Sequence, residues 1–273
     1  MKKPVAAIIY DFDKTLCTKD MQEYAFIPAL GMTASAFWAE VNAMTDREEM
    51  DNILAYMYQM VEKARDRQIP VTRQTFHQMG KQIEYFRGVT TWFDRINAYA
   101  ETIGIGVEHY IVSSGIKEII EGTEIAEHFK KIYACEFLYG ESGSIQWPKL
   151  AVNYTAKTQF LFRINKGVLT IDSKSAERLN RFTPENDRPI PFRNMIYIGD
   201  GLTDVPCMRL VKSNGGQSIA VYDHGRDAAE QLKKADRVNF VVPADYGPDS
   251  RIEVIVKSIL RKIQAVEEMQ SHQ

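Results

Sequence analysis

Two short motifs in the 273-residue sequence each place a pair of carboxylates directly after an apolar run. The first motif, D-F-D-K-T-L at residues 11–16, contributes Asp11 and Asp13. The second, G-D-G-L-T-D at residues 199–204, contributes Asp200 and Asp204. Carboxylates so close together repel one another unless a proton or a cation compensates their charge. A lone D-x-D can be a solvated surface turn, but four such carboxylates at two strand ends predict a cation, and Mg²⁺ prefers hard oxygen ligands.

A third motif, Ser113-Ser114-Gly115, follows the apolar run at residues 107–112. A hydroxyl group together with backbone N–H groups at a helix N-terminus suits a phosphate oxygen. Serine is also a common helix cap, so this motif alone leaves both interpretations open.

A cluster of carboxylates also needs a basic side chain near it, and three lysines are candidates. Lys149 follows a proline, and Lys166 precedes a glycine at the far end of a predicted helix. Lys157 opens that helix, and apolar residues follow it three, four and seven positions later. This spacing predicts that Lys157 lies near the helix start on the face turned toward the sheet. We therefore select Lys157 by its position.

The elements that must position these residues are short apolar runs at 5–10, 107–112 and 194–198, with weaker runs at 218–222 and 238–242. Continuous apolar runs of this length are typical of strands buried on both faces of a parallel sheet. Helix-like segments lie between them, so the pattern predicts an α/β fold with a mostly parallel sheet. Ligands of such sheets bind at the carboxyl ends of the strands, where the motifs lie.

Residues 18–87 differ from the rest, because they contain no strand-like run and are rich in methionine and aromatic residues. We interpret them as three or four helices inserted after the first strand, with the methionines and aromatics mainly in their core. Thr45 and Glu48 have the spacing of a capping box, and Thr33 and Thr72 are candidate caps of neighbouring helices. Apolar residues from Ile252 onward keep the spacing of a C-terminal helix with one buried face.

The composition narrows the class of protein. There are 34 Lys and Arg residues against 36 Asp and Glu, and 45% of the residues are hydrophobic. This balance is typical of a globular protein and gives no support to a nucleic-acid partner. No apolar run approaches the roughly 20 residues of a membrane span, so no membrane partner is expected. Three scattered cysteines indicate free thiols, and the apolar run at 5–10 is too short for a signal peptide, so the predicted location is cytoplasmic.

The order of these four features resembles that of the haloacid dehalogenase superfamily of phosphohydrolases, over about residues 5–242. The helical insert corresponds in position to the cap of the phosphoserine phosphatase-like branch, which shares the S-x-G continuation. The resemblance implies a Rossmann-like three-layer core with a mostly parallel sheet, made of residues 1–17 and 88–273, and an all-helical cap at 18–87. Hinges are expected near residues 17–19 and 87–89.

The resemblance also implies roles for single residues. Asp11 would be the nucleophile that forms an aspartyl-phosphate, and Asp13 the general acid and base. Mg²⁺ would bind Asp11, the backbone carbonyl of Asp13, and Asp200, with Asp204 in support. The phosphate group would be held by the remaining motif residues, with Thr15 fixing the loop or donating to phosphate: Thr15, Ser113, Ser114, Gly115 and Lys157.

Specificity is left open by departures from the phosphoserine phosphatases. Those enzymes usually carry a glutamate seven residues after the second motif aspartate, where this chain has Asp20. Asp20 is therefore a possible substrate contact, or an acid at a helix N-terminus. Ser114 stands where a second glycine is common. The branch also uses a cap arginine for the substrate carboxylate, and four candidates remain: Arg47, Arg65, Arg67 and Arg73.

The leading hypothesis is a Mg²⁺-dependent phosphatase that acts on a small phosphorylated metabolite. A phosphotransferase or mutase would use the same motifs, and the sequence does not separate the two. A phospho-acceptor signalling domain lacks a helical insert after the first strand, and a non-catalytic binding protein is disfavoured because every catalytic position is filled. No G-x-G-x-x-G follows the first strand, which disfavours a dinucleotide enzyme. The oligomeric state is not predicted.

Overall fold

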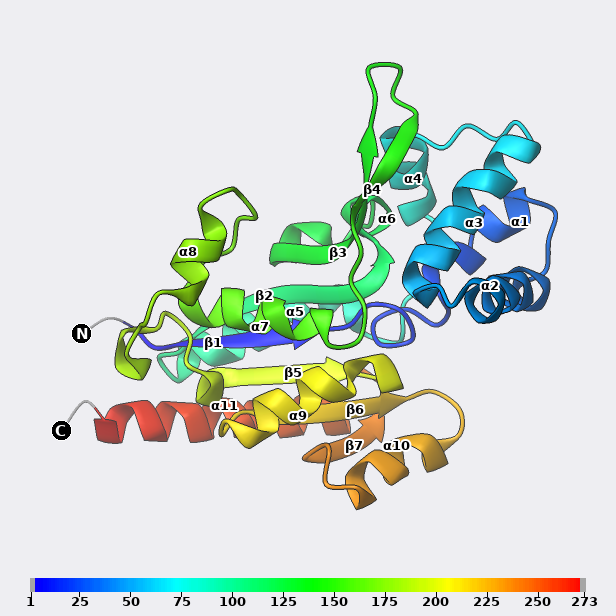
Figure 1. Cartoon of the computed structure of the whole chain (residues 1–273). Coiled ribbons are helices and arrows are strands. Elements are labelled where there is room, and N and C mark those ends of the chain that lie inside the picture. The colour runs from blue at the N-terminus through cyan, green and yellow to red at the C-terminus, as the bar shows by residue number, and fades with distance from the viewer. Residues whose placement is uncertain (1–2, 271–273) are drawn as a thin grey trace.

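A seven-stranded sheet forms the centre of the computed structural model, which describes residues 3–270 (Figure 1). The strands follow the order β4-β3-β2-β1-β5-β6-β7, and every neighbouring pair is parallel except β3 with β4. The predicted α/β fold with a mostly parallel sheet is therefore confirmed. The strands are β1 (Val5–Tyr10), β2 (Gly106–Ile116), β3 (Phe129–Tyr139), β4 (Ile145–Leu150), β5 (Met195–Gly199), β6 (Gln217–Tyr222) and β7 (Phe240–Pro243).

Each of the five apolar runs predicted as strands overlaps a strand, although β2 is longer than its run and β5 and β7 are shifted toward the C-terminus. The sequence analysis missed β3 and β4, which form an antiparallel hairpin at one edge of the sheet. Lysines interrupt the start of β3, and β4 contains Pro148 beside polar residues. The apolar run in β3 is only four residues long, at 132–135, and β4 has none, because part of the hairpin extends into solvent, where Trp147 is 71% exposed.

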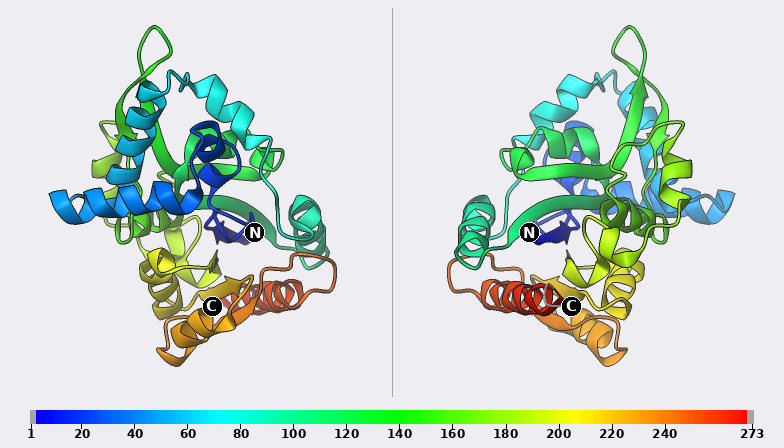
Figure 2. Two further views of the ribbon diagram at one scale, coloured as in Figure 1. Left: turned by 90° about the vertical axis from the view of Figure 1, so that its right-hand side faces the viewer. Right: turned by 90° about the vertical axis from the view of Figure 1, so that its left-hand side faces the viewer.

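Helices cover both faces of the sheet and complete the three layers (Figures 1 and 2). On one face, α7 (Ala156–Lys166) packs against β2, and α9 (Val205–Ser213) packs against β5 and β6. On the other face, α5 (Val89–Thr102) packs against β2, and α11 (Arg251–Gln270) packs against α5 and β7. The apolar spacing predicted for the C-terminal helix is confirmed, since Ile252, Val256 and Leu260 are buried. The remaining elements outside residues 18–87 are α6 (Lys117–Glu121), η2 (Ala126–His128), α8 (Ser175–Asn180), η3 (Glu185–Asp187), η4 (Phe192–Asn194), η5 (Leu202–Asp204) and α10 (Arg226–Lys234).

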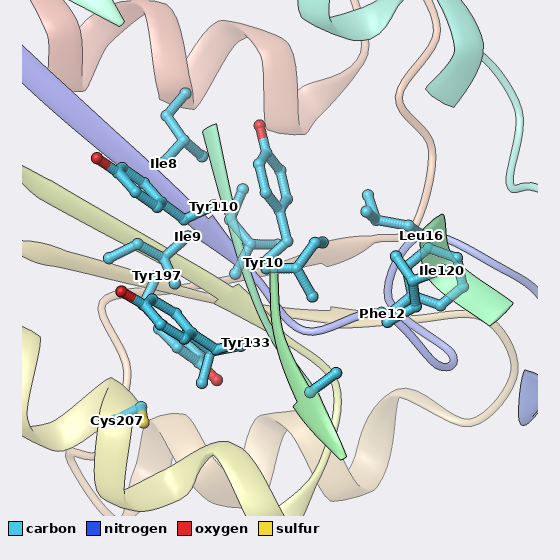
Figure 3. Packing of buried hydrophobic residues seen from close by; sticks show 14 of the residues in the cluster. Ile8, Ile9, Tyr10, Phe12, Leu16, Tyr110, Ile120, Tyr133, Tyr197 and Cys207 are labelled. Carbon is cyan, nitrogen blue, oxygen red and sulfur yellow. The ribbon is translucent and has the colours of Figure 1, made fainter. Parts of the chain in front are cut away.

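Tyrosines on the central strands fill the core between these layers, and successive strand side chains point to opposite faces (Figure 3). Tyr10 is the last residue of β1, and its hydroxyl accepts a hydrogen bond from Trp92 Nε1 at 2.7 Å. The same hydroxyl lies 3.0 Å from His109 Nδ1, and His109 Nε2 lies 3.0 Å from Asn97 Oδ1. This buried network fixes the end of β1 directly before Asp11. Burial, reinforced by His128, lowers the pKa of His109 to about 3.

The segment at residues 18–87, called the helical insert below, consists of helices and connecting loops. Thr33 and Thr72 cap α2 and α4 as predicted, by accepting hydrogen bonds from Ala36 N and Thr75 N. The predicted capping box at Thr45 is wrong, because Thr45 lies in the last turns of α2 and Asp51 caps α3. The elements are η1 (Met21–Glu23), α1 (Phe26–Ala29), α2 (Ala34–Glu48), α3 (Asn52–Asp66) and α4 (Arg73–Gly80).

Two of the contacts between the helical insert and the core involve backbone atoms at close range. The insert's two connections run side by side, since Thr18 N donates to Glu84 O and Phe86 N donates to Leu16 O, both at 3.0 Å. Farther away, α4 crosses α6 at Gly80 and Gly122 (Figure 2). A Cβ on Gly122 would lie 2.1 Å from the carbonyl oxygen of His77, so only glycine permits this approach.

The three cysteines, Cys17, Cys135 and Cys207, are buried and unpaired, as the sequence indicated. Within residues 3–270, none of the helices combines the length and the apolar character that a membrane span requires.

Gly122→Ala tests the crossing of α4 and α6. We expect the free energy of unfolding to fall by about 1–3 kcal/mol or more, because the added methyl group overlaps backbone atoms that cannot move independently. The measurement is chemical denaturation followed by circular dichroism. Gly106→Ala is the matched control, since its nearest neighbour would lie at an ordinary 3.5 Å. Equal stability of the two variants would contradict the close approach.

The buried His109 makes stability depend on pH. The unfolded chain takes up a proton near the ordinary pKa of 6.5, whereas the folded protein does so only at about 3. The stabilisation is thus complete above pH 6.5 and is lost as the pH falls toward 3, by up to about 1.4 kcal/mol per pH unit. His109→Gln should flatten the stability profile between pH 6 and 4. The exposed His224 gives the control His224→Gln, which should keep the native slope; equal slopes in both variants would refute the prediction.

Candidate active site

Strand register brings three sequence motifs to one edge of the sheet. Tyr10 of β1 pairs with Ile111 of β2 on one side and with Ile198 of β5 on the other. Asp11 follows directly, and its N–H donates to the carbonyl of Ile198 at 2.9 Å. Ser113 and Asp200 each lie two residues past those partners, so all three meet at the carboxyl ends of the strands. These ends point toward the helical insert (Figure 1).

Asp11, Asp200 and Asp204 form a cluster in which one carboxylate oxygen of each lies within 4.8 Å of the others. Thr15 Oγ1 donates to Asp200 Oδ1 at 3.2 Å, so the structure brings Thr15 to this carboxylate. Asp204 is held by Tyr197, whose hydroxyl donates to Oδ1 at 2.8 Å, and by the N–H of Gly201. A Cβ on Gly199 would lie 2.5 Å from Asp204 Oδ2, so the first glycine of the motif makes room for this side chain.

Lys157 is the cation of the cluster, as its position at the start of α7 predicted. Its ammonium group lies 2.8 Å from Asp204 Oδ1 and 3.2 Å from Asp11 Oδ1, and the side chain is fully buried. Burial alone would lower the pKa of Lys157, but Asp11 and Asp204 raise it above its ordinary value, so the amine stays charged. The other two lysines lie elsewhere: Lys149 pairs with Glu136 on the hairpin, and Lys166 donates to backbone carbonyls beyond α7.

One lysine does not neutralise three carboxylates, and burial together with the remaining negative charge raises the pKa values of Asp11 and Asp200. Burial and the charge of Asp204 raise the pKa of Asp11 to about 6, although Lys157 opposes this. Burial, Asp204 and Asp11 together raise the pKa of Asp200 to about 8. Both groups would lose a proton more readily if a further positive charge lay between them.

The donor set fits a hard divalent cation such as Mg²⁺, because every available ligand is a carboxylate oxygen. Asp204 already accepts hydrogen bonds from Lys157, Tyr197 and Gly201 N on its two oxygens. Asp11 and Asp200 are therefore the carboxylates best placed to bind a metal, and Asp204 holds the lysine. The side chain of Asp13 is not part of the cluster, and its backbone carbonyl as a ligand stays a prediction.

Asp13 lies outside the three-carboxylate cluster. One of its carboxylate oxygens accepts a hydrogen bond, and the other lies next to the motif at residues 113–115. Its Oδ1 accepts a hydrogen bond from Met21 N at 2.8 Å. Its Oδ2 is so near Gly115 that a Cβ there would lie 2.9 Å away. Burial, together with the charges of Asp20 and Asp11, raises the pKa of Asp13 well above its usual range. Such a carboxyl group can carry a proton at neutral pH.

Ser113, Ser114 and Gly115 form an irregular end of β2, not the helix N-terminus that the sequence analysis considered. The pairing with β3 breaks between Val112 and Ile116, and α6 begins only at Lys117. Ser113 Oγ accepts a hydrogen bond from Gly115 N at 3.0 Å, so it shapes the loop. The carbonyl of Ser114 accepts a hydrogen bond from Tyr56 of the helical insert at 2.5 Å.

A cavity of about 530 Å³ opens above these residues, between the strand ends and the helical insert. Asp20 lies at its wall, where Oδ2 is 2.6 Å from the ammonium of Lys14, and it makes no cap bond to η1. None of the four candidate cap arginines lines the cavity, because all four are exposed on other faces of the insert: Arg47, Arg65, Arg67 and Arg73.

The insert contributes cavity residues that the sequence analysis did not single out. These residues lie on η1, α2 and α3. No sequence motif marks them, because the same helices carry other apolar and amide residues that look alike in the sequence. Only the docking of the insert reveals which of them face the strand ends: Gln22, Trp38, Asn52, Ile53 and Tyr56.

The comparisons with known proteins agree with this architecture. A sequence model of the haloacid dehalogenase-like hydrolases matches residues 8–209. An uncharacterized protein of Borreliella burgdorferi is 28% identical over 279 residues, covering 92% of this chain and 95% of that protein. Two solved structures share the fold at low identity. A substrate-bound phosphoserine phosphatase has a TM-score of 0.56 at 14% identity, covering 94% of this chain and 99% of the other. A hydrolase from Salmonella enterica serovar Typhi has a TM-score of 0.58 at 16% identity, covering 88% and 68%.

The ion cluster around Lys157 can be tested by a double-mutant cycle. Lys157→Met should lower the free energy of unfolding by about 3 kcal/mol, because it leaves two buried carboxylates without their cation. Adding Asp204→Asn should recover part of that loss, since the amide retains hydrogen bonding but removes one charge. Urea denaturation at pH 7.5 gives the four free energies. Additivity of the two single effects within about 0.5 kcal/mol would show that the groups do not interact.

Proposed function

The chain belongs to the haloacid dehalogenase-like hydrolase family, and from this we propose that it is a Mg²⁺-dependent phosphatase of a small-molecule phosphomonoester. In this proposal the reaction passes through an aspartyl-phosphate on Asp11. The observation that carries it is the placement of Asp11 at the floor of the cavity, 3.2 Å from the buried ammonium of Lys157 and beside the carboxylate of Asp200.

The first step is attack by Asp11. A carboxylate oxygen of Asp11 forms a bond to phosphorus, and the bond between phosphorus and the leaving oxygen breaks. Asp13 gives its proton to that leaving oxygen, so the product leaves as a neutral alcohol. The position of Asp13 supports this role, because its Oδ1 is fixed by Met21 N and its Oδ2 remains available beside Gly115.

The second step is hydrolysis of the aspartyl-phosphate. Asp13, now a carboxylate, takes a proton from a water molecule as the water oxygen bonds to phosphorus. The bond between phosphorus and Asp11 breaks, inorganic phosphate is formed, and both aspartates return to their starting state. Lys157 and the loop at residues 113–115 hold the phosphoryl oxygens in both steps, and Thr15 orients Asp200.

Mg²⁺ would be held by Asp11 and Asp200, and when bound it supplies positive charge that screens the carboxylates from an anionic phosphate. The helical insert acts as the cap of the site, since its helices form the cavity wall opposite the strand ends and exclude bulk water. We assign the catalytic core to residues 1–17 and 88–273, and the cap to residues 18–87.

The test is phosphate release from p-nitrophenyl phosphate at pH 7.5. We expect release by the native protein with Mg²⁺, loss of activity with chelator, and recovery when Mg²⁺ is restored. Asp11→Asn should lower kcat by at least about a thousandfold, because the amide cannot act as the nucleophile.

Asp187→Asn, on the exposed loop before β5, is the matched control and should keep native activity. Activity that survives Asp11→Asn would refute the assigned nucleophile. Transfer of phosphate between two alcohols without release of free phosphate would replace the phosphatase by a phosphotransferase.

A further inference from the structure

Polar atoms without partners point to what the cavity binds beyond phosphate. Gln22 is 2% exposed and lines the cavity, yet its Oε1 has no hydrogen-bond partner among the described residues. Ser114 Oγ, on the opposite wall, is likewise buried without a partner. Leaving a buried amide oxygen unpaired is costly, so an acceptor held in this way indicates a ligand group that donates to it.

The aromatic side chains of the same wall offer apolar surface only. Trp38 and Tyr56 pack edge to face, with ring centroids 6.0 Å apart. Trp38 Nε1 already donates to Glu23 at 3.0 Å, and the Tyr56 hydroxyl donates to Ser114 O. Since both polar groups are occupied, the rings present carbon surface to the cavity, and Ile53 extends it.

The charges of the wall disfavour an anionic leaving group. Among the described residues, Lys14 is the one cation that lines the cavity, and it is paired with Asp20 at 2.6 Å. Three of the insert's arginines form ion pairs on other faces: Arg47 with Glu48, Arg65 with Glu62, and Arg73 with Glu121. A carboxylate or second phosphate would therefore meet Asp20 without a free cation among the described residues that line the cavity.

We propose that the leaving group of the substrate is uncharged and hydroxyl-bearing. One hydroxyl or N–H group donates to Gln22 Oε1, and a flat carbon face lies against Trp38 and Tyr56. The neutral sugar of a sugar phosphate and the nucleoside of a nucleoside monophosphate share this chemistry, whereas phosphoserine, with its carboxylate, does not. The inference rests on the proposed phosphatase function, and it makes Gln22 a specificity-determining residue.

The first experiment compares kcat/KM for three esters at pH 7.5 with Mg²⁺: a hexose phosphate, a nucleoside 5′-monophosphate and phosphoserine. At least one of the two neutral classes should exceed phosphoserine by about tenfold or more, and the better of them identifies the source of the leaving group. Phosphoserine turned over as well as or better than both would overturn the inference while leaving the phosphatase in place.

Binding to the Asp11→Asn protein, measured by calorimetry, tests the same ranking without turnover. If the native protein releases no phosphate from any ester, including p-nitrophenyl phosphate, the proposed function fails. The binding order then still decides the inference: tighter binding of a neutral ester than of phosphoserine supports it, and the reverse order overturns it.

Variants of the wall separate specificity from folding. Gln22→Met removes the acceptor at similar volume and should raise KM for the best neutral ester by about tenfold relative to KM for p-nitrophenyl phosphate, which has no donor. Gln22→Glu keeps an acceptor and should restore most of that ratio. Asn52→Arg adds a cation to the wall and should shift the preference toward phosphoserine. The exposed Arg47→Gln is the control and should leave all ratios unchanged. Unchanged ratios in Gln22→Met and Asn52→Arg would overturn the role of this wall.

Discussion

A single ammonium group, buried between two carboxylates, is the interaction on which the arrangement of the site depends. Lys157 contacts Asp11 after β1 and Asp204 after β5, so one side chain connects the start of α7 to two strand ends that pairing already holds side by side. The contact is possible only because Gly199 has no side chain and Tyr197 fixes the orientation of Asp204. A buried charge must be paired, and here that requirement sets the relative positions of three elements.

The cavity has two chemically different sides, the strand ends and the helical insert. The floor carries more carboxylates than its one lysine neutralises, which suits a divalent cation and, through it, an anionic phosphoryl group. The roof, from the helical insert, presents aromatic carbon and amide groups. Under the proposed function, the strand ends would recognise charge, and the insert would recognise shape and hydrogen-bonding groups.

The sequence predicted the site residues at the strand ends better than those on the helical insert, for a physical reason. Parallel strands place their carboxyl ends at one edge, so Asp11, Ser113 and Asp200 could be brought together from their order in the chain alone. Lys157 followed from helical spacing toward the sheet. No such rule applies to the insert, where Gln22 and Trp38 line the cavity through the way its helices dock on the core.

The errors have local causes. The hairpin of β3 and β4 escaped prediction because it lies partly in solvent, so that the apolar run of β3 is short and β4 has none. The capping box predicted at Thr45 is wrong because α2 continues past this residue, and a residue inside one helix cannot cap the following helix. The sequence analysis interpreted residues 113–115 as the start of a helix, but the pairing with β3 is interrupted there, so these residues form an irregular strand end.

The hydrogen bond from Tyr56 to the carbonyl of Ser114 joins the helical insert to the loop that we propose holds the phosphoryl group. Thermodynamic linkage makes such a contact reciprocal. If a phosphate group bound at the loop stabilises α3 against that loop, then α3 in contact with the loop strengthens the binding of phosphate by the same free energy. Under the proposed function, the leaving group and the phosphate would therefore not be recognised independently, because one backbone carbonyl connects the two surfaces that bind them. The covalent bond that the proposed reaction breaks would also be the bond that lets the two halves of the substrate act together.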